Sequence, residues 1–244
     1  MVNNKLKIVN DFGITPTTSY TAAGLDFYIP KLSDLSTDKR AIAIEAFKKS
    51  FNVSDEDMNK LFDYFSHELT ARIGADKAPY LIEDAIHLFL GLDCPNSRRK
   101  STDLETKVSF FCNERMVYED GKLGMKLDFG DHIKINSGIK EALPHSYAGI
   151  FFNKSGRGTG GLDVRACVVD EDYTGYVHLS LAYTKDVDLY KVFAGDKITQ
   201  QVILPIYLVD ECEEIDKDEY DEIMKDSNRG DAGFGSTDNI KNVK

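Results

Sequence analysis

The sequence of 244 residues has no long hydrophobic run. Its longest apolar stretches, residues 86–92 and 202–209, are far shorter than the roughly 20 residues that a membrane-spanning helix needs. The first residues also lack an apolar stretch of signal-peptide length. We therefore expect no membrane partner, no secretion and a cytoplasmic location.

Cysteine is scarce and scattered, at positions 94, 112, 167 and 212. No Cys-x-x-Cys or His-Cys pair has metal-ligand spacing, which argues against a zinc site. The sequence also contains no P-loop and no Gly-x-Gly-x-x-Gly after a strand, so the two commonest nucleotide-binding folds have no support. A reduced, intracellular protein is the expectation.

Positive charge is not in excess, because 30 basic side chains face 41 acidic ones and the net charge is −11. This balance argues against broad attachment to nucleic acid or to an anionic membrane. Residues 210–226 alone hold ten acids and two lysines, so the rest of the chain is nearly neutral. A polyanionic substrate can still bind a local cluster of cations and backbone amides.

The hydrophobic pattern changes along the chain from a period of two to a helical period and back. Residues 1–30 and roughly 105–209 predict strands, and roughly 33–100 predict helices. One helix follows Ser54 and ends at Gly74, a second begins near Pro79 and ends at Gly91, and a weaker one precedes both. The three helices are expected to form a small bundle.

The many short strands predict a barrel, sandwich or jelly roll. Residues 176–183 alternate as a half-buried strand does, and they follow an acidic turn that ends at Gly175. Residues 202–209 contain Pro205, which favours an edge or a bend over a central strand. The expected organisation is a β core (1–32 and 105–209), a helical insertion (33–104), an acidic connector (210–228) and a glycine-rich arm (229–244).

Two glycine-rich segments have the composition of phosphate-binding loops. In residues 229–238, glycines let backbone amides turn toward an anion, and Arg229 can add a bidentate contact to it. Phe234 has no apolar neighbours in the sequence to pack on, so a flat ligand such as a base is a sensible partner. In residues 153–161, Lys154, Ser155 and the amide of Gly156 have the same capacity. The alternatives are a solvated tail and an ordinary hairpin loop.

Carboxylates occur at two further places, in residues 170–172 and at Asp26. A carboxylate cluster can orient water for attack on phosphorus or hold Mg²⁺, although most such clusters are solvated turns. Together with the two glycine-rich segments and Phe234, these are the parts of a site for metal-assisted nucleotide hydrolysis.

Five segments stand in a specific order: Ala22-Ala-Gly-Leu-Asp26, Lys154-Ser-Gly156, Val169-Asp-Glu-Asp-Tyr-Thr-Gly175, Gly195-Asp-Lys-Ile-Thr-Gln200 and Arg229 to Thr237. They resemble the five ordered motifs of the trimeric dUTP diphosphatases (dUTPases), and residues 139–144 also look like that family. The resemblance covers roughly residues 1–32 and 127–238 and leaves the helices unmatched.

The resemblance implies a mainly β fold, a dUTPase-like jelly roll (β-clip) with an inserted α-helical subdomain, that assembles as a homotrimer. Each of three active sites would combine the first, second and fourth motifs of one subunit with the third motif of another and the tail of a third. The implied reaction is Mg²⁺-assisted hydrolysis of dUTP to dUMP and pyrophosphate, which keeps uracil out of DNA and supplies dUMP.

The resemblance also implies roles for single residues. Asp170 would orient the attacking water with help from Gln200, and Asp26 would contact waters of the triphosphate-bound Mg²⁺. Tyr173 would lie under the deoxyribose, and Phe234 would stack on uracil. The remaining implied substrate contacts are Lys154, Ser155, Gly156, Arg229, Gly235, Ser236 and Thr237.

Some positions depart from the family pattern. Lys154 stands where most members carry arginine, which exchanges a rigid fork for a point charge. Arg165 and Cys167 occupy positions that often hold small residues. The alternative within the same fold is a dCTP deaminase, in which a glutamate stands at the position of Ser180 and an arginine near that of Thr159. Because this chain lacks both and has the dUTPase tail, deamination is the weaker alternative.

The helical insertion has no counterpart in a minimal dUTPase. Residues 33–100 hold twelve acids and ten bases, which does not suit a nucleic-acid arm. Either the helices are a structural embellishment, or they bind a protein partner and the chain has a regulatory function. Insertions of this kind are associated with phage enzymes, and the location would then be the host cytoplasm.

Overall fold

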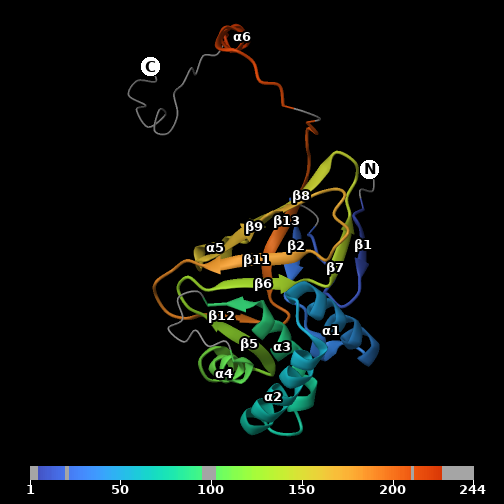
Figure 1. The fold of residues 1–244 in the computed structure, drawn as a ribbon, viewed down its shortest axis with the longest axis vertical. Helices are drawn as coiled ribbons and strands as arrows, with labels where there is room; N and C mark the ends of the chain where they lie inside the picture. The colour runs from blue at the N-terminus through green and yellow to red at the C-terminus, as the bar shows by residue number, and fades with distance from the viewer. Residues whose placement is uncertain (1–4, 20–21, 95–102, 210–211, 227–244) are drawn as a thin grey trace. The chain divides into compact units, whose positions relative to one another are not determined.

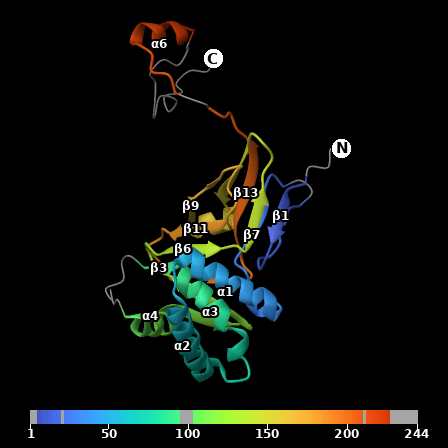
Figure 2. The same cartoon turned by 45° about the vertical axis from the view of Figure 1, so that its right-hand side comes forward.

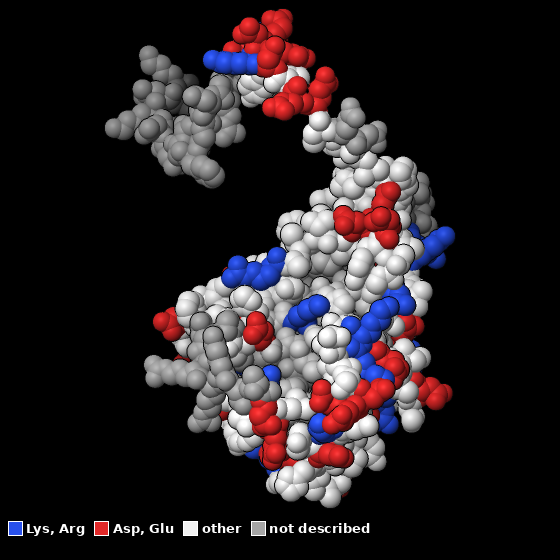
Figure 3. Space-filling view, in the orientation of Figure 1, with Lys and Arg blue, Asp and Glu red and all other residues white. Residues whose placement is uncertain are grey.

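The computed structural model describes residues 5–19, 22–94, 103–209 and 212–226, and by its contacts the chain divides after Ile206 into two compact units. The described part of the second unit contains the helix α6 (Lys217–Ile223), whose first turn is capped by Asp216. Figure 3 shows acidic side chains gathered on this helix, whereas acids and bases are interspersed over the visible face of the first unit. None of the described helices is long and apolar enough to cross a bilayer.

The first unit is built from antiparallel strands in four sheets (Figure 1). The strands are β1 (Lys7–Asn10), β2 (Leu25–Tyr28), β3 (Leu92–Asp93), β4 (Met116–Glu119), β5 (Lys122–Leu127), β6 (His132–Asn136), β7 (Ile139–Ala142), β8 (Tyr147–Asn153), β9 (Leu162–Ala166), β10 (Val168–Val169), β11 (His178–Tyr183), β12 (Tyr190–Phe193) and β13 (Lys197–Pro205). Their orders are β10-β8-β13-β2, β3-β6-β11-β9, β12-β5-β4 and β1-β7. The predicted class, a mainly β fold of the jelly-roll type with inserted helices, is confirmed.

The three predicted helices are present between β2 and β3, as α1 (Thr37–Phe51), α2 (Asp55–Ile73) and α3 (Ile82–Gly91). The Ser54 hydroxyl accepts the Asp57 N–H at 3.1 Å and caps α2, which ends where Gly74 adopts φ +92°. The start of α3, expected near Pro79, lies three residues later, at Ile82. Pro79 lies in a 3-10 turn (Ala78–Tyr80), and Leu81, with ψ 0°, separates this turn from the helix.

The prediction of strands from residue 105 onward is wrong for residues 105–115. They form α4 (Leu104–Phe110) and a π-helical turn (Phe111–Arg115). The Asp103 carboxylate accepts the Thr106 N–H at 2.8 Å, and Val108, Phe111 and Cys112 are buried at helical spacing. A side-chain cap and one apolar face therefore stabilise this helix. Its hydrophobic pattern is too short to be recognised in the sequence between two β segments.

The helices share one hydrophobic core with the sheets, and Figures 1 and 2 show α1 to α4 together beside the same end of the strands. α3 packs on β5 and β6, and the Phe12 and Phe47 rings meet edge to face at 5.5 Å. The chain leaves α3 directly into β3, which pairs with β6. The helical segment is thus joined to the β core by side-chain packing and by a strand of its own.

Residues 202–209 behave differently in their two halves. β13 lies between β8 and β2, but in the described residues its pairing with β2 ends at Gln201, while its pairing with β8 continues to Pro205. The predicted edge is therefore confirmed for residues 202–205 only. Pro205 is tolerated because it is the last residue of the strand.

A buried carboxylate connects the helices to the end of β2. Asp84 of α3 is 2% exposed and accepts the N–H groups of Leu32 at 2.7 Å and Ser33 at 3.2 Å. Burial raises the pKa of Asp84 to about 6, against the lowering by these hydrogen bonds.

We expect Asp84→Ala to lower the free energy of unfolding by about 1–3 kcal/mol, because two buried N–H groups lose their acceptor. Urea unfolding at neutral pH measures this change. The control is Asp34→Ala, which removes only the exposed ion pair with Lys31 at 2.7 Å and should cost less than about 1 kcal/mol. Equal losses in the two variants would contradict a structural role for Asp84.

Candidate functional site

Three predicted site residues meet at one end of the β10-β8-β13-β2 sheet. Asp26 of β2 lies opposite Gln200 of β13, and Gln200 lies opposite Phe152 of β8. Lys154 follows the last residue of β8 and forms an ion pair with Asp26. Residues far apart in the sequence are thus brought together by strand register alone.

The Asp26 carboxylate is held by two cations. Lys154 Nζ binds one oxygen, and Lys197 Nζ lies 3.1 Å from the other. Partial burial raises the pKa of Asp26, but the hydrogen bonds and charges of the two lysines outweigh it and lower the pKa below the ordinary value of 3.8. The site therefore keeps one carboxylate ionised between two ammonium groups.

Lys197 is a site residue that the sequence reasoning missed. Its ammonium group lies 5.5 Å from the centre of the Tyr28 ring, and its hydrogen bond to Asp26 raises its pKa. The lysine stands inside the fourth motif, 195–200, yet only the strand register, which sets Lys197 opposite Tyr28, brings it to Asp26.

The connection between β8 and β9 contains a short helix, α5 (Ser155–Thr159). The Gly158 N–H donates to the Lys154 carbonyl at 2.8 Å, and Ser155 and Gly156 form the first turn. Arg157 fixes this turn, because its guanidinium donates to Asp196 Oδ2 at 2.9 Å and to the Lys197 carbonyl at 3.0 Å. The second and fourth motifs are therefore locked together.

Gln200 is the third member of this end of the sheet. Its side chain is partly exposed, and Nε2 donates to the Asn153 carbonyl at 3.3 Å. The Asn153 side chain is itself held, since its Nδ2 donates to Asp163 at 2.7 Å and its Oδ1 accepts the Val164 N–H at 2.7 Å. Asn153, which accepts the hydrogen bond of Gln200, is thus itself held in place by β9.

The third motif lies elsewhere on the sheet. Asp170 is exposed after β10, and Tyr173 is also exposed, with its hydroxyl donating to the Tyr176 carbonyl at 2.9 Å. A methyl group on Gly175 would lie 2.5 Å from the Tyr173 hydroxyl, so the ring rests on this glycine. Glu171 turns back to accept from Ser146 N–H and bonds His145 at 2.9 Å, which removes it from the predicted carboxylate cluster.

The register fixes how far Asp170 is from the other site residues. Val169 lies opposite Gly149, which lies opposite Ile203, so Asp170 follows at the level of Leu204. Gln200 is four residues away along the strand and two strands across, which is about 13 Å in one direction and about 10 Å in the other. One water cannot contact both side chains in a single chain.

Five predicted site residues lie outside the described part of the chain. They are Arg229, Phe234, Gly235, Ser236 and Thr237.

The described residues fit Mg²⁺ only as an ion carried by a substrate. They contain no group of three or more His, Cys, Asp or Glu side chains able to hold a metal. Asp26 is the site's carboxylate, with both oxygens already bound by lysines. Mg²⁺ keeps several waters and commonly binds phosphates, so an outer contact from Asp26 to such waters suits this donor set.

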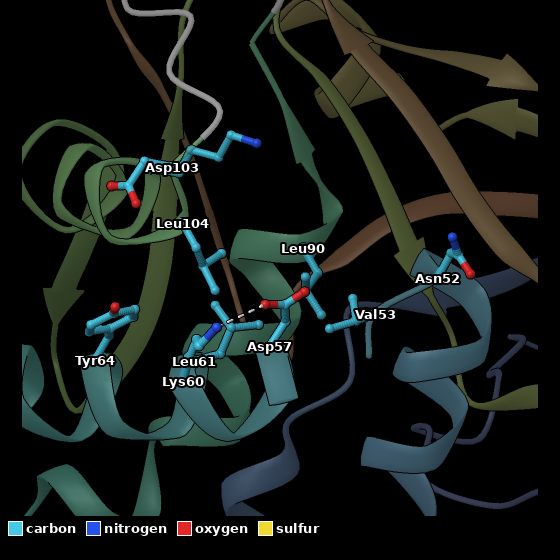
Figure 4. A pocket seen from close by; sticks show the side chains of 10 residues that line it. Asn52, Val53, Asp57, Lys60, Leu61, Tyr64, Leu90, Asp103 and Leu104 are labelled. Carbon is cyan, nitrogen blue, oxygen red and sulfur yellow. Dashed lines mark ion pairs between the residues drawn. The ribbon is translucent and has the colours of Figure 1, made fainter. Parts of the chain in front are cut away.

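A hollow of about 440 Å³ lies among the helices, away from these residues (Figure 4). Apolar side chains and charges of both signs line it, with Lys60 and Asp57 3.7 Å apart. No predicted site residue is part of its lining.

A family model and several known proteins match parts of this chain. The family model named dUTPase matches residues 123–238. A deoxyuridine 5'-triphosphate nucleotidohydrolase of vaccinia virus (strain Copenhagen) is 32% identical over 108 residues, which cover 44% of this chain and 68% of the viral protein. The chain belongs to the dUTPase family.

Two further dUTPases are similar to parts of this chain. The enzyme of Eremothecium gossypii is 43% identical over 79 residues, 32% of this chain and 47% of that protein. The structure of a mutant dUTPase from phage phi11 of S. aureus covers 43% of this chain and 88% of that chain, with 18% identity and a TM-score of 0.35. The family match begins in β5, so α1 to α4 lie outside it.

We expect Lys154→Met to raise the pKa of Asp26, because one of the two cations that stabilise the carboxylate is removed. An NMR titration of the Asp26 carboxyl carbon measures this shift. The matched control is Lys191→Met, because Lys191 pairs with Glu119 in another sheet and its loss should leave the Asp26 titration unchanged. An unchanged Asp26 pKa in Lys154→Met would show that this ion pair does not form.

Proposed function

We propose that this dUTPase family member hydrolyses dUTP to dUMP and pyrophosphate by attack of water on the α-phosphorus. The observation that carries the proposal is the meeting of Asp26, Lys154 and Gln200 at one end of a sheet, in the order in which the family motifs occur. The relatives named deoxyuridine 5'-triphosphate nucleotidohydrolase support it.

The residues have distinct tasks in this proposal. Lys154 and the backbone amides at the start of α5 bind phosphate oxygens, because charged and aligned N–H donors suit a polyanion. Asp170 and Gln200 hold the attacking water. Tyr173 lies against the deoxyribose, where a 2'-hydroxyl would meet its ring. Arg229, Phe234, Gly235, Ser236 and Thr237 are proposed to close over the nucleotide.

Enzymes of this family generally use Mg²⁺. When bound with the triphosphate, the ion would neutralise charge on the phosphate oxygens. Asp26 is proposed to contact its waters, since its lowered pKa keeps the carboxylate able to accept hydrogen bonds at neutral pH.

Members of the family are typically trimers, and we propose a homotrimer here. The calculated separation of Asp170 from Gln200 supports sites that take these residues from two chains. The same face of the sheet that carries Gln200 also exposes Val168 (57%), Phe152 (44%) and Leu204 (40%). A second copy of the chain that covers this apolar strip would bring its own residues to the site.

The alternatives have less support. Ser180 of β11 supplies a hydroxyl where a deaminase needs a carboxylate base. A regulatory partner bound through the helices remains a prediction. Phe47, Phe65 and Leu69 are buried in the common core, so these three apolar side chains are not available to bind such a partner. A cytoplasmic location also remains a prediction.

Release of pyrophosphate from dUTP, dCTP, dTTP and UTP with Mg²⁺ tests the reaction. We expect turnover of dUTP alone, and a loss of about 10²–10⁴-fold in kcat for Asp170→Asn, which cannot orient the water as a base. Asp172→Asn, in the same exposed turn, is the control and should retain activity. A folded trimer that hydrolyses none of the four nucleotides would overturn the proposal.

Mixing two inactive variants tests the shared site. Asp170→Asn supplies intact second and fourth motifs, and the double variant Asp26→Asn with Gln200→Ala supplies an intact third motif. After unfolding and joint refolding, about a quarter of the sites should combine intact residues from two chains, and activity should return to about that fraction. The same variants refolded separately and mixed at the end are the control. No recovery in jointly refolded trimers would exclude a site shared in this way.

A further inference from the structure

A buried polar pair joins the two sheets behind the candidate site. Glu141 of β7 is 8% exposed and Gln201 of β13 is fully buried. Gln201 Nε2 donates to Glu141 Oε2 at 2.8 Å. β7 belongs to the small sheet with β1, whereas β13 is the strand that carries Gln200, so this hydrogen bond links the site strand to a different sheet.

The Gln201 amide nitrogen is the one donor group of the pair, which also contains three acceptor oxygens. Among the buried side-chain atoms of the described residues, Glu141 Oε1 and Gln201 Oε1 both lack a hydrogen-bond partner. An ionised glutamate has no hydrogen to donate, and a buried acceptor left without a donor costs about 1–3 kcal/mol. The two unpaired oxygens belong to the two partners of a single hydrogen bond.

We propose that Glu141 is protonated in the folded protein and forms a cyclic acid–amide pair with Gln201 that positions β13 in the active site. A hydrogen on Glu141 Oε1 donates to Gln201 Oε1, while Gln201 Nε2 donates to Glu141 Oε2. One proton thus satisfies both unpaired oxygens. The two residues are positioning residues, since neither touches the proposed substrate.

The surroundings of Glu141 favour the neutral acid. Burial raises its pKa, and the hydrogen bond from Gln201 lowers it only in part. On its own strand, Lys140 is directed to Asp11 at 3.8 Å and to the Tyr176 ring at 4.5 Å. The charged groups of the neighbouring elements also have other partners or are exposed: Lys7 of β1 opposite Ala142, His145 before β8 with Glu171, and Lys197 of β13 with Asp26 of β2.

The amide of Gln201 has little room to move. A methyl group on Gly149 would lie 2.3 Å from Gln201 Nε2, so the amide packs directly on the β8 backbone. Gln201 also lies opposite Leu25, the residue before Asp26. Because side chains alternate along a strand, Gln201 points into the core while its neighbour Gln200 points to the site. The cyclic pair therefore fixes the strand at the residue next to Gln200.

The sign of the pH dependence follows from a raised pKa. The pair contributes fully to stability below about pH 4.5, the ordinary pKa of a glutamate, and this contribution is lost as pH rises through the folded pKa. In that window the folded protein holds one proton more than the unfolded chain. The folding equilibrium constant then falls by up to about tenfold per pH unit.

Glu141→Gln tests the pair, because a second amide reproduces the proton's hydrogen bond and cannot titrate. Urea unfolding gives the folding equilibrium constant of each protein. We expect the ratio of the wild-type constant to the variant constant to fall as pH rises from about 4.5. The infrared difference spectrum of wild type minus variant should show a protonated carboxyl band at pH values above 4.5, because the band of Asp84 is common to both proteins and cancels. Parallel stability curves, or no such band, would overturn the inference.

The positioning role rests on the proposed function and has its own readout. In dUTP hydrolysis the ratio of wild-type to Glu141→Gln kcat should fall over the same pH window, with KM nearly unchanged. Asp84→Asn is the control, because it removes another buried titrating carboxyl, whose hydrogen bonds go to the backbone N–H groups of Leu32 and Ser33 and not to Gln201. It should alter the stability profile but leave the kcat ratio flat. Equal kcat profiles for wild type and Glu141→Gln would reject positioning. Absence of any dUTP turnover would instead reject the proposed function, and the infrared and stability results would stand.

Discussion

The candidate site depends on the register of β13 between β8 and β2. Hydrogen bonds on both sides of this strand set Gln200 level with Asp26 and with Phe152, next to the turn that begins with Lys154. Because side chains alternate, a slip of one residue would send Gln201 to the site and bury Gln200 in its place. The register of β13 against β2 shifts between Lys197 and Thr199, and this shift brings Lys197 to the face of the sheet on which Asp26 and Gln200 lie.

The charge pattern of the site is opposite to that of the whole chain. The sequence is acidic, with a net charge of −11, yet at the end of the sheet Lys154 binds one oxygen of Asp26 and Lys197 binds the other. Two cations against one carboxylate leave a local positive charge where the phosphates of a nucleotide would arrive. Most of the acidic excess lies in residues 210–226, which hold ten acids and two lysines and belong to the second compact unit.

Much of this architecture is predictable from the sequence, for identifiable reasons. Helix α2 has a side-chain cap at Ser54, a long apolar stripe and a terminal Gly74, and each is a strong local signal. Helices α4 and α5 were not predicted, because α4 is short and α5 contains two glycines, and both are stabilised by contacts formed only in the folded chain.

The candidate site divides in the same way. Asp26, Lys154 and Gln200 are visible in the sequence because they stand in ordered motifs. Lys197 and the Glu141–Gln201 pair are not, since their importance comes from residues that are distant in sequence and meet across strands. Propensity and motif spacing carry no information about such partners.

The strand β3 gives the helical segment a protective role that its helices alone do not suggest. In the sheet β3-β6-β11-β9, β3 pairs with His132 and Ile133 at the outer side of β6, where N–H and C=O groups would otherwise be open to another chain. The same segment covers Phe12 with Phe47. A shortened chain without these helices would therefore present a bare sheet edge beside uncovered apolar side chains, the combination from which intermolecular aggregation starts.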